Sequence, residues 1–452
     1  MRVCSFLFDC PGTCAFAFLN CPAATIVKAR PDVIELPTIR WTEAGLACSA
    51  RWRSEKGIAP HKRVVIADEQ MSADTAYRLA CEGTALLWRG DFQNARQMLL
   101  ALARRADEKT RKASKASRAS KPQKSATPAT VLSPIPASPD RATAAQTSPP
   151  TEAFHLHRLA QSQRARTLGM LLLPLAGDYT VPLRRAPDLQ RACVGAYGPP
   201  GGDMAGDSVV SMRELLGIIG AHEWRKKGVE VPAINDRIHP HYGVFAPVRG
   251  EYVGLVAEAA LPVLPSSGSS TKSLPLAFDI GTGTGVLAAV LARRGIERVI
   301  ATDLDPRALA CARENIKRLK LNTQVDIVHA DLFPEGRAPL IVCNPPWIPA
   351  RPSSPIEGAI YDPDSRMLRG FISGLAAHLA PCGEGWLILS DIAEHLGLRS
   401  RAQLLAYFEQ AGLVVIDRHD ARPSHPRVSD AGDPLHAARA AEVTSLWRLG
   451  AY

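Results

Sequence analysis

The sequence predicts an α/β protein with a doubly wound, mostly parallel sheet of seven strands, preceded by helical N-terminal segments. From about residue 231 onward, short apolar runs of strand length alternate with amphipathic stretches of helix length. Alternation at these lengths is typical of parallel strands whose connecting helices cover both faces of a sheet. Acidic residues or glycines also follow several of the apolar runs. Because ligands of such sheets bind at the carboxyl ends of the strands, the functional site is expected there.

Seven apolar runs are the predicted strands. In order they read PLAFDI, RVIATD, VDIVHAD, LIVCN, GWLILS, LVVID and AEVTSLWRL. The predicted helices between them are TGVLAAVLARRG, PRALACARENIKRL, residues 366–379 and RAQLLAYFEQAG, whose apolar residues recur at helical spacing. The last two runs follow each other without a predicted helix. One of them is therefore expected to be antiparallel, at the edge of the sheet.

Composition divides the chain into five parts. The predictions are an N-terminal extension over residues 1–34, a small helical unit over 35–108, a disordered linker over 109–151, a mostly helical substrate-side segment over 152–230 and the alternating domain over 231–452. The helical unit is inferred from large apolar residues at helical spacing. The extension is not expected to be a signal peptide, because an aspartate and a proline interrupt its apolar stretch.

The net charge of +10 is concentrated in the predicted linker. Seven of its basic residues lie in one run without an acidic residue, namely Lys109, Arg111, Lys112, Lys115, Arg118, Lys121 and Lys124. The surrounding Ser, Ala and Pro residues cannot bury enough apolar surface to offset the entropy of ordering, so a solvated tether is predicted. Non-specific binding of nucleic-acid phosphates is the alternative.

Four of the ten cysteines cluster within residues 4–21 without a C-x-x-C spacing, and the other six are scattered among apolar residues. Scattered thiols are typical of a reducing compartment, so a cytoplasmic location is predicted and a metal site is not; zinc is the weaker alternative. The densest apolar stretch, residues 168–175, is too short to span a bilayer, and no membrane association is expected.

A glycine-rich turn follows the first predicted strand, in the sequence Asp279-Ile-Gly281-Thr-Gly283-Thr-Gly285. Glycines allow a tight turn and a close approach of a ligand to the backbone. The dinucleotide fingerprint G-x-G-x-x-G would need a third glycine at the position of Val286. Asp279 would moreover repel a pyrophosphate, so a cationic ligand without phosphate is favoured.

S-adenosylmethionine has that chemistry, since it carries an ammonium and a sulfonium group and no phosphate. Asp303 ends the second predicted strand and is expected to accept hydrogen bonds from the ribose hydroxyls. Asp331 follows the third strand and is expected to accept one from the adenine amine. Together with Asp279, each of these acids lies at the carboxyl end of a predicted strand. That shared position predicts one binding site.

The fourth strand ends in an unusual corner, Asn344-Pro345-Pro346-Trp347. Consecutive prolines remove backbone donors and fix the local conformation, so the strand cannot continue. A planar nitrogen has a delocalised lone pair and must be held in line with the methyl group. The side-chain oxygen of Asn344 and the carbonyl of Pro345 could accept its two N–H groups, while Trp347 would supply a flat wall.

These motifs resemble those of class I S-adenosylmethionine-dependent methyltransferases. The segments FDIGTGTG, TD, ADLF and NPPW carry the resemblance, and FAPVRGEYVGLV (245–256) is similar to a segment of the protein-(glutamine-N5) methyltransferases that modify release factors. The resemblance covers residues 238–450 and implies a Rossmann-like fold, S-adenosylmethionine as cofactor and a translation-factor-like protein substrate. The residues it implies are catalytic Asn344, Pro345 and Trp347, and cofactor-binding Asp279, Gly281, Gly283, Gly285, Asp303, Asp331 and Asn344.

Trp347 departs from that family, in which tyrosine is more frequent at this position. Methyltransferases of adenine N6 and guanine N2 resemble the same pattern, and a base stacks well on an indole ring. An RNA or DNA base is therefore an open alternative to a protein glutamine. A non-catalytic binding module with a relic site is a further alternative, and the sequence does not predict the oligomeric state.

Overall fold

The computed structural model describes residues 37–119, 150–201, 206–264, 273–352, 355–423, 430 and 432–452. The chain divides into two compact units, residues 1–35 and 36–452. The first unit, and with it the predicted N-terminal extension, lies outside the described residues. The description below therefore concerns the second unit. Among the described residues, none of the helices combines the length and the apolar character that a membrane span requires.

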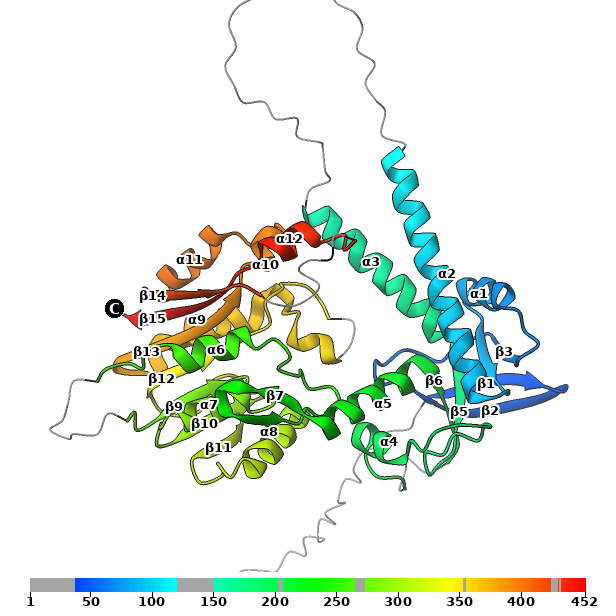
Figure 1. Ribbon diagram of the computed structural model, residues 1–452, viewed down its shortest axis with the longest axis horizontal. Coiled ribbons are helices and arrows are strands. Elements are labelled where there is room, and N and C mark those ends of the chain that lie inside the picture. Colours follow the sequence, from blue (N-terminus) through cyan, green and yellow to red (C-terminus); the bar gives the residue numbers. More distant parts are fainter. Residues whose placement is uncertain are drawn as a thin grey trace, which may run out of the picture. The chain divides into compact units, whose positions relative to one another are not determined.

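A seven-stranded sheet forms the C-terminal part of the second unit (Figure 1). Its strands are β9 (Ala277–Ile280), β10 (Val299–Asp303), β11 (Val325–His329), β12 (Ala338–Cys343), β13 (Leu379–Ser390), β14 (Leu413–Ala421) and β15 (Thr444–Ala451). Their spatial order is β11-β10-β9-β12-β13-β15-β14, with parallel pairing from β11 to β13. The doubly wound, Rossmann-like fold predicted from the sequence is confirmed.

One detail of that sheet prediction is wrong. The antiparallel strand is β15, which lies between β13 and β14 rather than at the edge. Every residue of β15 except the terminal Ala451 is buried or half-buried, and Leu446 is fully buried. A strand that is apolar on both faces is suited to an interior position, whereas the more exposed β14 is suited to the edge.

Helices cover both faces of this sheet because successive residues of each strand face opposite sides. In β12, Leu340 and Val342 pack in one hydrophobic core with α6 and α7, while Ile341 and Cys343 pack in another with α9 and α11. The helices of this part are α6 (Glu251–Glu258), α7 (Val286–Arg293), α8 (Pro306–Arg318), α9 (Arg366–His378), α10 (Ile392–His395), α11 (Arg401–Gln410) and α12 (His436–Ala441).

Short elements complete this part of the chain. The hairpin strands β7 (Val229–Val231) and β8 (Asp236–Ile238) are separated by the 3-10 helix η2 (Pro232–Ile234), and η3 (Pro355–Ala359) and η4 (Pro363–Ser365) follow β12. The turns η3 and η4 lie in the segment between the Asn-Pro-Pro-Trp corner and α9. They connect the end of β12 to the helix that covers it.

A six-stranded mixed sheet occupies the N-terminal part of the second unit, in the order β1-β2-β6-β5-β4-β3. Its strands are β1 (Thr38–Glu43), β2 (Leu46–Arg53), β3 (Val64–Ala67), β4 (Ala85–Trp88), β5 (Leu171–Leu175) and β6 (Ser208–Ser211). Its helices are α1 (Ala73–Cys81), α2 (Phe92–Ala119), α3 (Pro150–Gly169), α4 (Gln190–Tyr197) and α5 (Met212–Lys227). Strands from both sides of the predicted linker pair directly, as β4 with β5 and β2 with β6.

The prediction of a small helical unit over residues 35–108 is therefore wrong, and the segment 152–230 is not a separate helical piece. The reason is visible in β4, whose sequence ALLW is entirely buried. A short, fully apolar run fits a buried strand and a buried helix turn equally well, so its periodicity does not distinguish them. Because β4 lies between the helices α1 and α2, its apolar residues are consistent with one continuous helical pattern.

The disorder predicted for residues 109–151 is also wrong at both ends of that range. Residues 109–119 continue α2, and α3 begins at Pro150. Lysine, arginine and alanine have high helix propensity, so a composition that resembles a linker also supports a continuing helix. Residues 120–149 lie outside the described residues, where the linker prediction stays untested.

Candidate functional site

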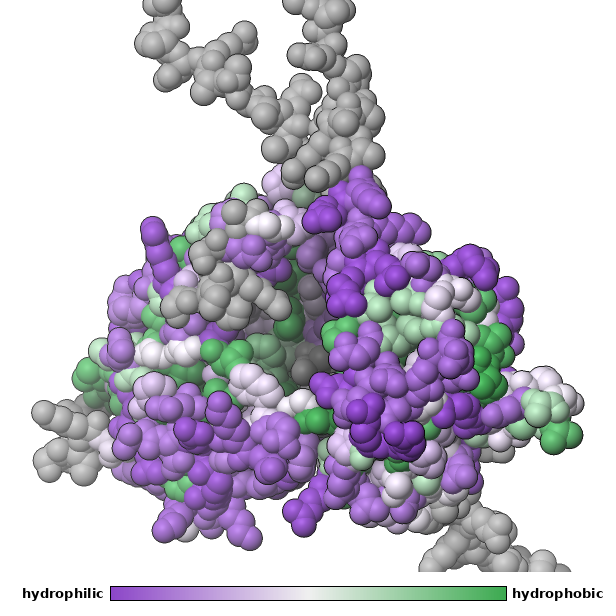
Figure 2. Space-filling view, turned by 45° about the vertical axis from the view of Figure 1, so that its right-hand side comes forward, coloured by the Kyte–Doolittle hydropathy of each residue, from purple (hydrophilic) through white to green (hydrophobic). Residues whose placement is uncertain are grey.

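A cavity of about 620 Å³ lies at the carboxyl ends of the central strands of the seven-stranded sheet. It is lined by the glycine turn after β9, by residues after β10 and β11, by the corner after β12 and by the segment before α6. The predicted site residues among its lining are Gly281, Gly283, Asp303, Asp331, Asn344, Pro345 and Trp347. A cavity of this size is suited to a small-molecule cofactor. On the face drawn in Figure 2, a recess with hydrophobic side chains at its floor interrupts the hydrophilic surface.

The glycine turn is held against β10 and α8. Gly281, Gly283 and Gly285 have φ values of +71°, +57° and +81°, in the left-handed region that favours glycine. The backbone N–H of Thr282 donates to the carbonyl of Thr302 at 2.8 Å. A side chain at Gly285 would come within 3.3 Å of the backbone of α8, so glycine is required there for close packing as well as for conformation.

Asp303 joins the end of β10 to that turn and lines the cavity. Its Oδ2 accepts a hydrogen bond from the N–H of Gly283 at 2.9 Å, and its Oδ1 accepts one from the N–H of Asp305 at 2.9 Å. Burial raises the pKa of Asp303, and these two backbone donors act in the opposite direction. The carboxylate is thus held in a fixed orientation at the rim of the turn.

Asp279 lies beneath the turn, and the residues that line the cavity do not include it. Only 1% of its surface is exposed, and its Oδ2 accepts from the hydroxyl of Thr282 at 2.6 Å and from the N–H of Ala288 at 3.0 Å. Burial raises the pKa of Asp279 to about 6. Its contacts connect the turn to the start of α7, and contact with a cationic ligand stays a prediction.

Asp331 follows β11 and lines the cavity. Its Oδ2 accepts a hydrogen bond at 2.6 Å from the guanidinium of Arg366, the first residue of α9. Both side chains are more than half exposed. An exposed ion pair contributes little to stability, so Asp331 can exchange this partner for a ligand at small cost.

The corner after β12 brings Asn344, Pro345 and Trp347 to the same cavity. The indole N–H of Trp347 donates to Oδ1 of Asn344 at 2.9 Å. Sequence reasoning treated Trp347 only as a flat wall and missed this contact. The spacing of three residues around two prolines was the available signal, because it brings the indole back toward the asparagine.

A partly buried ion pair lies next to this corner. The guanidinium of Arg249 donates through Nη1 and Nη2 to the two carboxylate oxygens of Glu442, both at 3.1 Å, and its Nε lies 3.0 Å from Oε1 of Glu251. The Arg249 guanidinium carbon is 5.4 Å from the centroid of the Trp347 ring. Glu442 also accepts from the hydroxyl of Ser390 at 2.8 Å. Glu442 was missed because nothing in its local sequence distinguishes it from a surface glutamate.

The lining fits S-adenosylmethionine. Asp303 and Asp331 offer carboxylate oxygens to hydroxyl or amine groups, and the glycine turn offers backbone contact. Among the described residues that line the cavity, each arginine faces a carboxylate: Arg249 faces Glu442, Arg366 faces Asp331 and Arg439 faces Asp433. The lining therefore suits a ligand without phosphate, as the sequence predicted.

Comparison with known proteins matches this part of the chain to methyltransferases. Residues 264–348 match the family described as Ribosomal protein L11 methyltransferase (PrmA). Over 181 residues the chain is 37% identical to a release factor glutamine methyltransferase of Cereibacter sphaeroides, covering 37% of this chain and 59% of that protein. Over 145 residues it is 34% identical to a ribosomal protein L11 methyltransferase of Pelotomaculum thermopropionicum, covering 32% of this chain and 39% of that protein.

A third relative acts on RNA according to its name. The chain is 32% identical over 135 residues to a tRNA1(Val) (adenine(37)-N6)-methyltransferase of Pedobacter heparinus, covering 27% of this chain and 58% of that protein. The chain thus spans between 39% and 59% of the length of these three relatives. The predicted resemblance to S-adenosylmethionine-dependent methyltransferases is confirmed for the C-terminal part.

Proposed function

We propose that the protein is an S-adenosylmethionine-dependent N-methyltransferase that acts on a planar nitrogen, the side-chain amide of a protein glutamine. The observation that carries this proposal is the convergence of two predicted motifs on one cavity. The glycine turn with Asp303 and Asp331 lines it on one side, and Asn344, Pro345 and Trp347 line it on another. A cofactor site and an acceptor site of this chemistry must adjoin for a methyl group to pass between them.

The chain's own residues would bind and orient the reactants. Asp303, Asp331 and the glycine turn would hold the cofactor, which supplies a methyl group on its sulfonium when bound. Asn344 would accept one N–H of the planar nitrogen through Oδ1, and the carbonyl of Pro345 would accept the other. When the nitrogen gains the methyl group and the thioether S-adenosylhomocysteine is left, one of these protons would be released to water. The two prolines fix the direction of that carbonyl before the substrate arrives, so alignment does not have to be achieved at the moment of reaction.

Two observations favour a protein substrate. The segment FAPVRGEYVGLV resembles the release-factor enzymes, and its Arg249 lines the cavity beside Trp347. The 37% identical relative carries a release-factor name. The proposed partner is therefore a translation factor with an accessible glutamine, in the cytoplasm. The ribosomal protein L11 methyltransferase name of the other relative supports a protein substrate in the same process.

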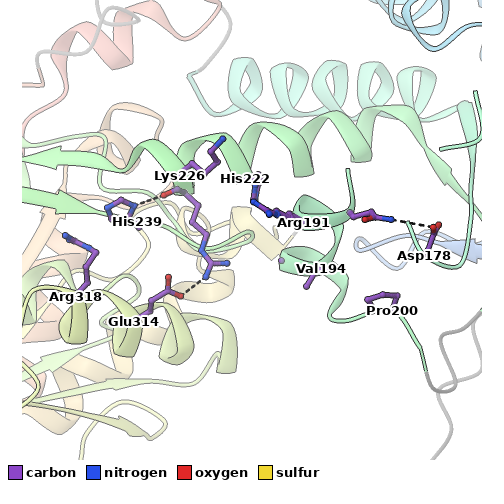
Figure 3. A pocket seen from close by; sticks show the side chains of 12 residues that line it. Asp178, Arg191, Val194, Pro200, His222, Lys226, His239, Glu314 and Arg318 are labelled. Carbon is purple, nitrogen blue, oxygen red and sulfur yellow. Dashed lines mark hydrogen bonds and ion pairs between the residues drawn. The ribbon is translucent and has the colours of Figure 1, made fainter. Parts of the chain in front are cut away.

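A nucleic-acid base is the second candidate, supported by the RNA-modifying relative and by a basic hollow elsewhere in the second unit. Figure 3 shows this hollow, whose basic lining consists of Arg191, Arg225, Lys226, Arg318, His222 and His239. Two of its arginines already face carboxylates, Arg225 with Glu314 at 2.6 Å and Arg318 with Asp236 at 3.0 Å. Because these ion pairs lower the positive charge available to bind phosphates, the support for a nucleic-acid substrate is weaker than the support for a protein substrate.

The test is incubation of the full chain with methyl-labelled S-adenosylmethionine and a soluble cell extract, followed by digestion with protease or nuclease. Label that is released by protease and resists nuclease is expected. Nuclease-sensitive label would select the second candidate. An absence of label, together with an absence of S-adenosylhomocysteine binding in calorimetry, would favour the binding module with a relic site.

A further inference from the structure

We propose that Trp347 is a positioning residue, which orients the side-chain amide of Asn344 through its indole N–H and is itself held by the Arg249–Glu442 pair. This inference rests on the proposed function, because Asn344 is the residue expected to meet the acceptor nitrogen. It assigns a directional role to a side chain that the sequence suggested only as a stacking surface.

The direction follows from the chemistry of the indole. An indole N–H can only donate a hydrogen bond, whereas an asparagine amide carries an acceptor oxygen at one end and a donor nitrogen at the other. The 2.9 Å contact from Trp347 therefore fixes the oxygen of Asn344, and not its nitrogen, at that position. An amide oxygen has two lone pairs, so the second remains for an N–H of the acceptor. The opposite orientation would present a donor and repel the acceptor's N–H.

A tyrosine at the same position would be less selective. A hydroxyl both donates and accepts, so it can pair with either end of the asparagine amide. A phenylalanine would retain the aromatic plane but would pair with neither end. The three side chains thus form a graded series in which the ring is conserved and the preference for the Asn344 oxygen decreases.

The indole is held by residues from two other segments of the chain. Arg249 precedes α6 and places its guanidinium 5.4 Å from the centroid of the Trp347 ring. Glu442 precedes β15 and fixes that guanidinium through two hydrogen bonds of 3.1 Å. Its carboxylate is in turn fixed by the hydroxyl of Ser390 at 2.8 Å, at the end of β13. The orientation of Asn344 is therefore tied to residues at the end of β13 and just before the start of β15.

The chain supplies a matched control for this arrangement. In the N-terminal sheet, the indole N–H of Trp41 donates to Oε2 of Glu43 at 2.9 Å, and Arg89 lies 5.8 Å from the Trp41 ring. Trp41 does not line the cavity that holds Asn344. Trp41→Phe therefore removes an indole N–H and a hydrogen bond of the same length beside an arginine, without touching the proposed site.

The first experiment measures the contact itself, independently of activity. The full chain has seven tryptophans, and a 15N-labelled sample gives one indole N–H signal for each. Trp347→Phe and Trp41→Phe assign the two signals by their loss. Asn344→Ala is expected to shift the Trp347 signal and to leave the Trp41 signal in place. A Trp347 signal that does not move in Asn344→Ala would overturn the inference, whatever the activity of the protein.

The second experiment measures transfer of labelled methyl groups to the extract fraction that the wild-type protein labels. At saturating S-adenosylmethionine, Trp347→Phe is expected to lower the rate about tenfold, the effect of losing one oriented hydrogen bond worth about 1.4 kcal/mol. Trp347→Tyr should fall between Trp347→Phe and wild type, and Trp41→Phe should match wild type. S-adenosylhomocysteine affinity should change by less than about twofold in each variant.

The outcomes separate the two levels of the proposal. A wild-type rate in Trp347→Phe would overturn the positioning role, and so would an equal loss of rate and S-adenosylhomocysteine affinity, because that indicates general damage to the cavity. If the wild-type protein labels no fraction of the extract, the proposed function fails. The indole measurement still decides in that case whether Trp347 orients Asn344.

Discussion

Two groups of tryptophan, arginine and glutamate lie in different parts of this molecule and have similar internal geometry. In the N-terminal sheet, Arg89 binds both carboxylate oxygens of Glu43, at 2.9 and 2.6 Å, below the ring of Trp41. In the C-terminal part, in loops at the edge of the cavity, Arg249 binds both oxygens of Glu442 beside the ring of Trp347. The arginine lies 5.8 Å from the ring centroid in the first group and 5.4 Å in the second.

The groups differ in the partner of the indole N–H. Trp41 donates back to Glu43, so the N-terminal group satisfies its own hydrogen bonds. Trp347 donates to Asn344, so the C-terminal group directs a donor toward a residue of the cavity. They also differ in burial, since the Glu43 side chain is 33% exposed and that of Glu442 is 5% exposed. The same three residue types therefore serve local structure in one sheet and orient a site residue in the other.

The largest expected effect concerns Asn344, which accepts the indole N–H of Trp347 as Glu43 accepts that of Trp41. Asn344→Ala should lower methyl transfer by about a hundredfold or more, because loss of a positioned polar group costs that much in comparable sites. Affinity for S-adenosylhomocysteine should stay within a few-fold. Glu43→Ala, the control at the acceptor of the N-terminal indole, should transfer at the wild-type rate. Transfer assays and calorimetry on both variants decide the matter, and near-normal turnover in Asn344→Ala would remove Asn344 from the mechanism.

The second prediction concerns how the stability of the fold depends on pH through Asp279, a buried carboxyl group of the C-terminal sheet. Burial raises the pKa of Asp279 to about 6, so its protonated form is favoured by folding. The stability this gives is complete below the unfolded pKa of about 4 and is lost as pH rises to about 6. Asp279→Asn should therefore gain stability relative to wild type over this window, by about 3 kcal/mol for a shift of this size.

Urea unfolding of the wild-type protein and Asp279→Asn between pH 3.5 and 7.5 measures that difference. Because the asparagine is neutral throughout, the gap between the two curves isolates the titration of one carboxyl. A gap that does not change with pH would contradict the raised pKa. A gap that changes in the opposite direction would mean that the fold favours the ionised form.

Residues that belong to contiguous motifs were predictable. The glycine turn, Asp303 and Asn344 each follow an apolar strand, and the doubly wound topology brings the ends of these strands together. The position of Asp279 could also have been found from alternation. Phe278 and Ile280 face the core beneath α9, so the intervening side chain must face α7, where it meets the N–H of Ala288.

The remaining features depend on contacts between distant parts of the sequence. Glu442 meets Arg249 across 193 residues, and neither position has a local pattern that identifies its partner. The N-terminal sheet was missed for a related reason. Its strand β4 pairs with β5, which lies beyond the lysine-rich segment, so the change in composition does not coincide with a domain boundary. Composition predicts which segments are exposed to solvent, but it does not predict which strands pair across such a segment.

The third prediction breaks the two glutamate–arginine pairs in parallel. Glu442→Gln leaves Arg249 with Glu251 as its remaining carboxylate, at 3.0 Å, in a partly buried position. Removal of one partner of a buried pair costs up to about 3–5 kcal/mol, and the 22% exposure of Arg249 reduces the expected loss to about 2 kcal/mol. Glu43→Gln should cost about 0–1 kcal/mol, as more exposed pairs do. Chemical denaturation at pH 7 compares the two directly, and equal losses would show that burial does not distinguish the groups.

The smallest expected effect is the pH dependence of the N-terminal pair, and its sign is opposite to that of Asp279. Hydrogen bonding by the Arg89 guanidinium lowers the pKa of Glu43, so folding favours the ionised form. The stability this contributes is present above the unfolded pKa and is lost as pH falls through the folded pKa. Glu43→Gln should therefore lie below wild type at pH 7, by about 0–1 kcal/mol, and approach it at acid pH. Unfolding curves at pH 7 and 3.5, repeated in 1 M salt to screen the exposed pair, measure this difference. A deficit in Glu43→Gln that persists at pH 3.5 would assign it to lost packing rather than to the charge of Glu43.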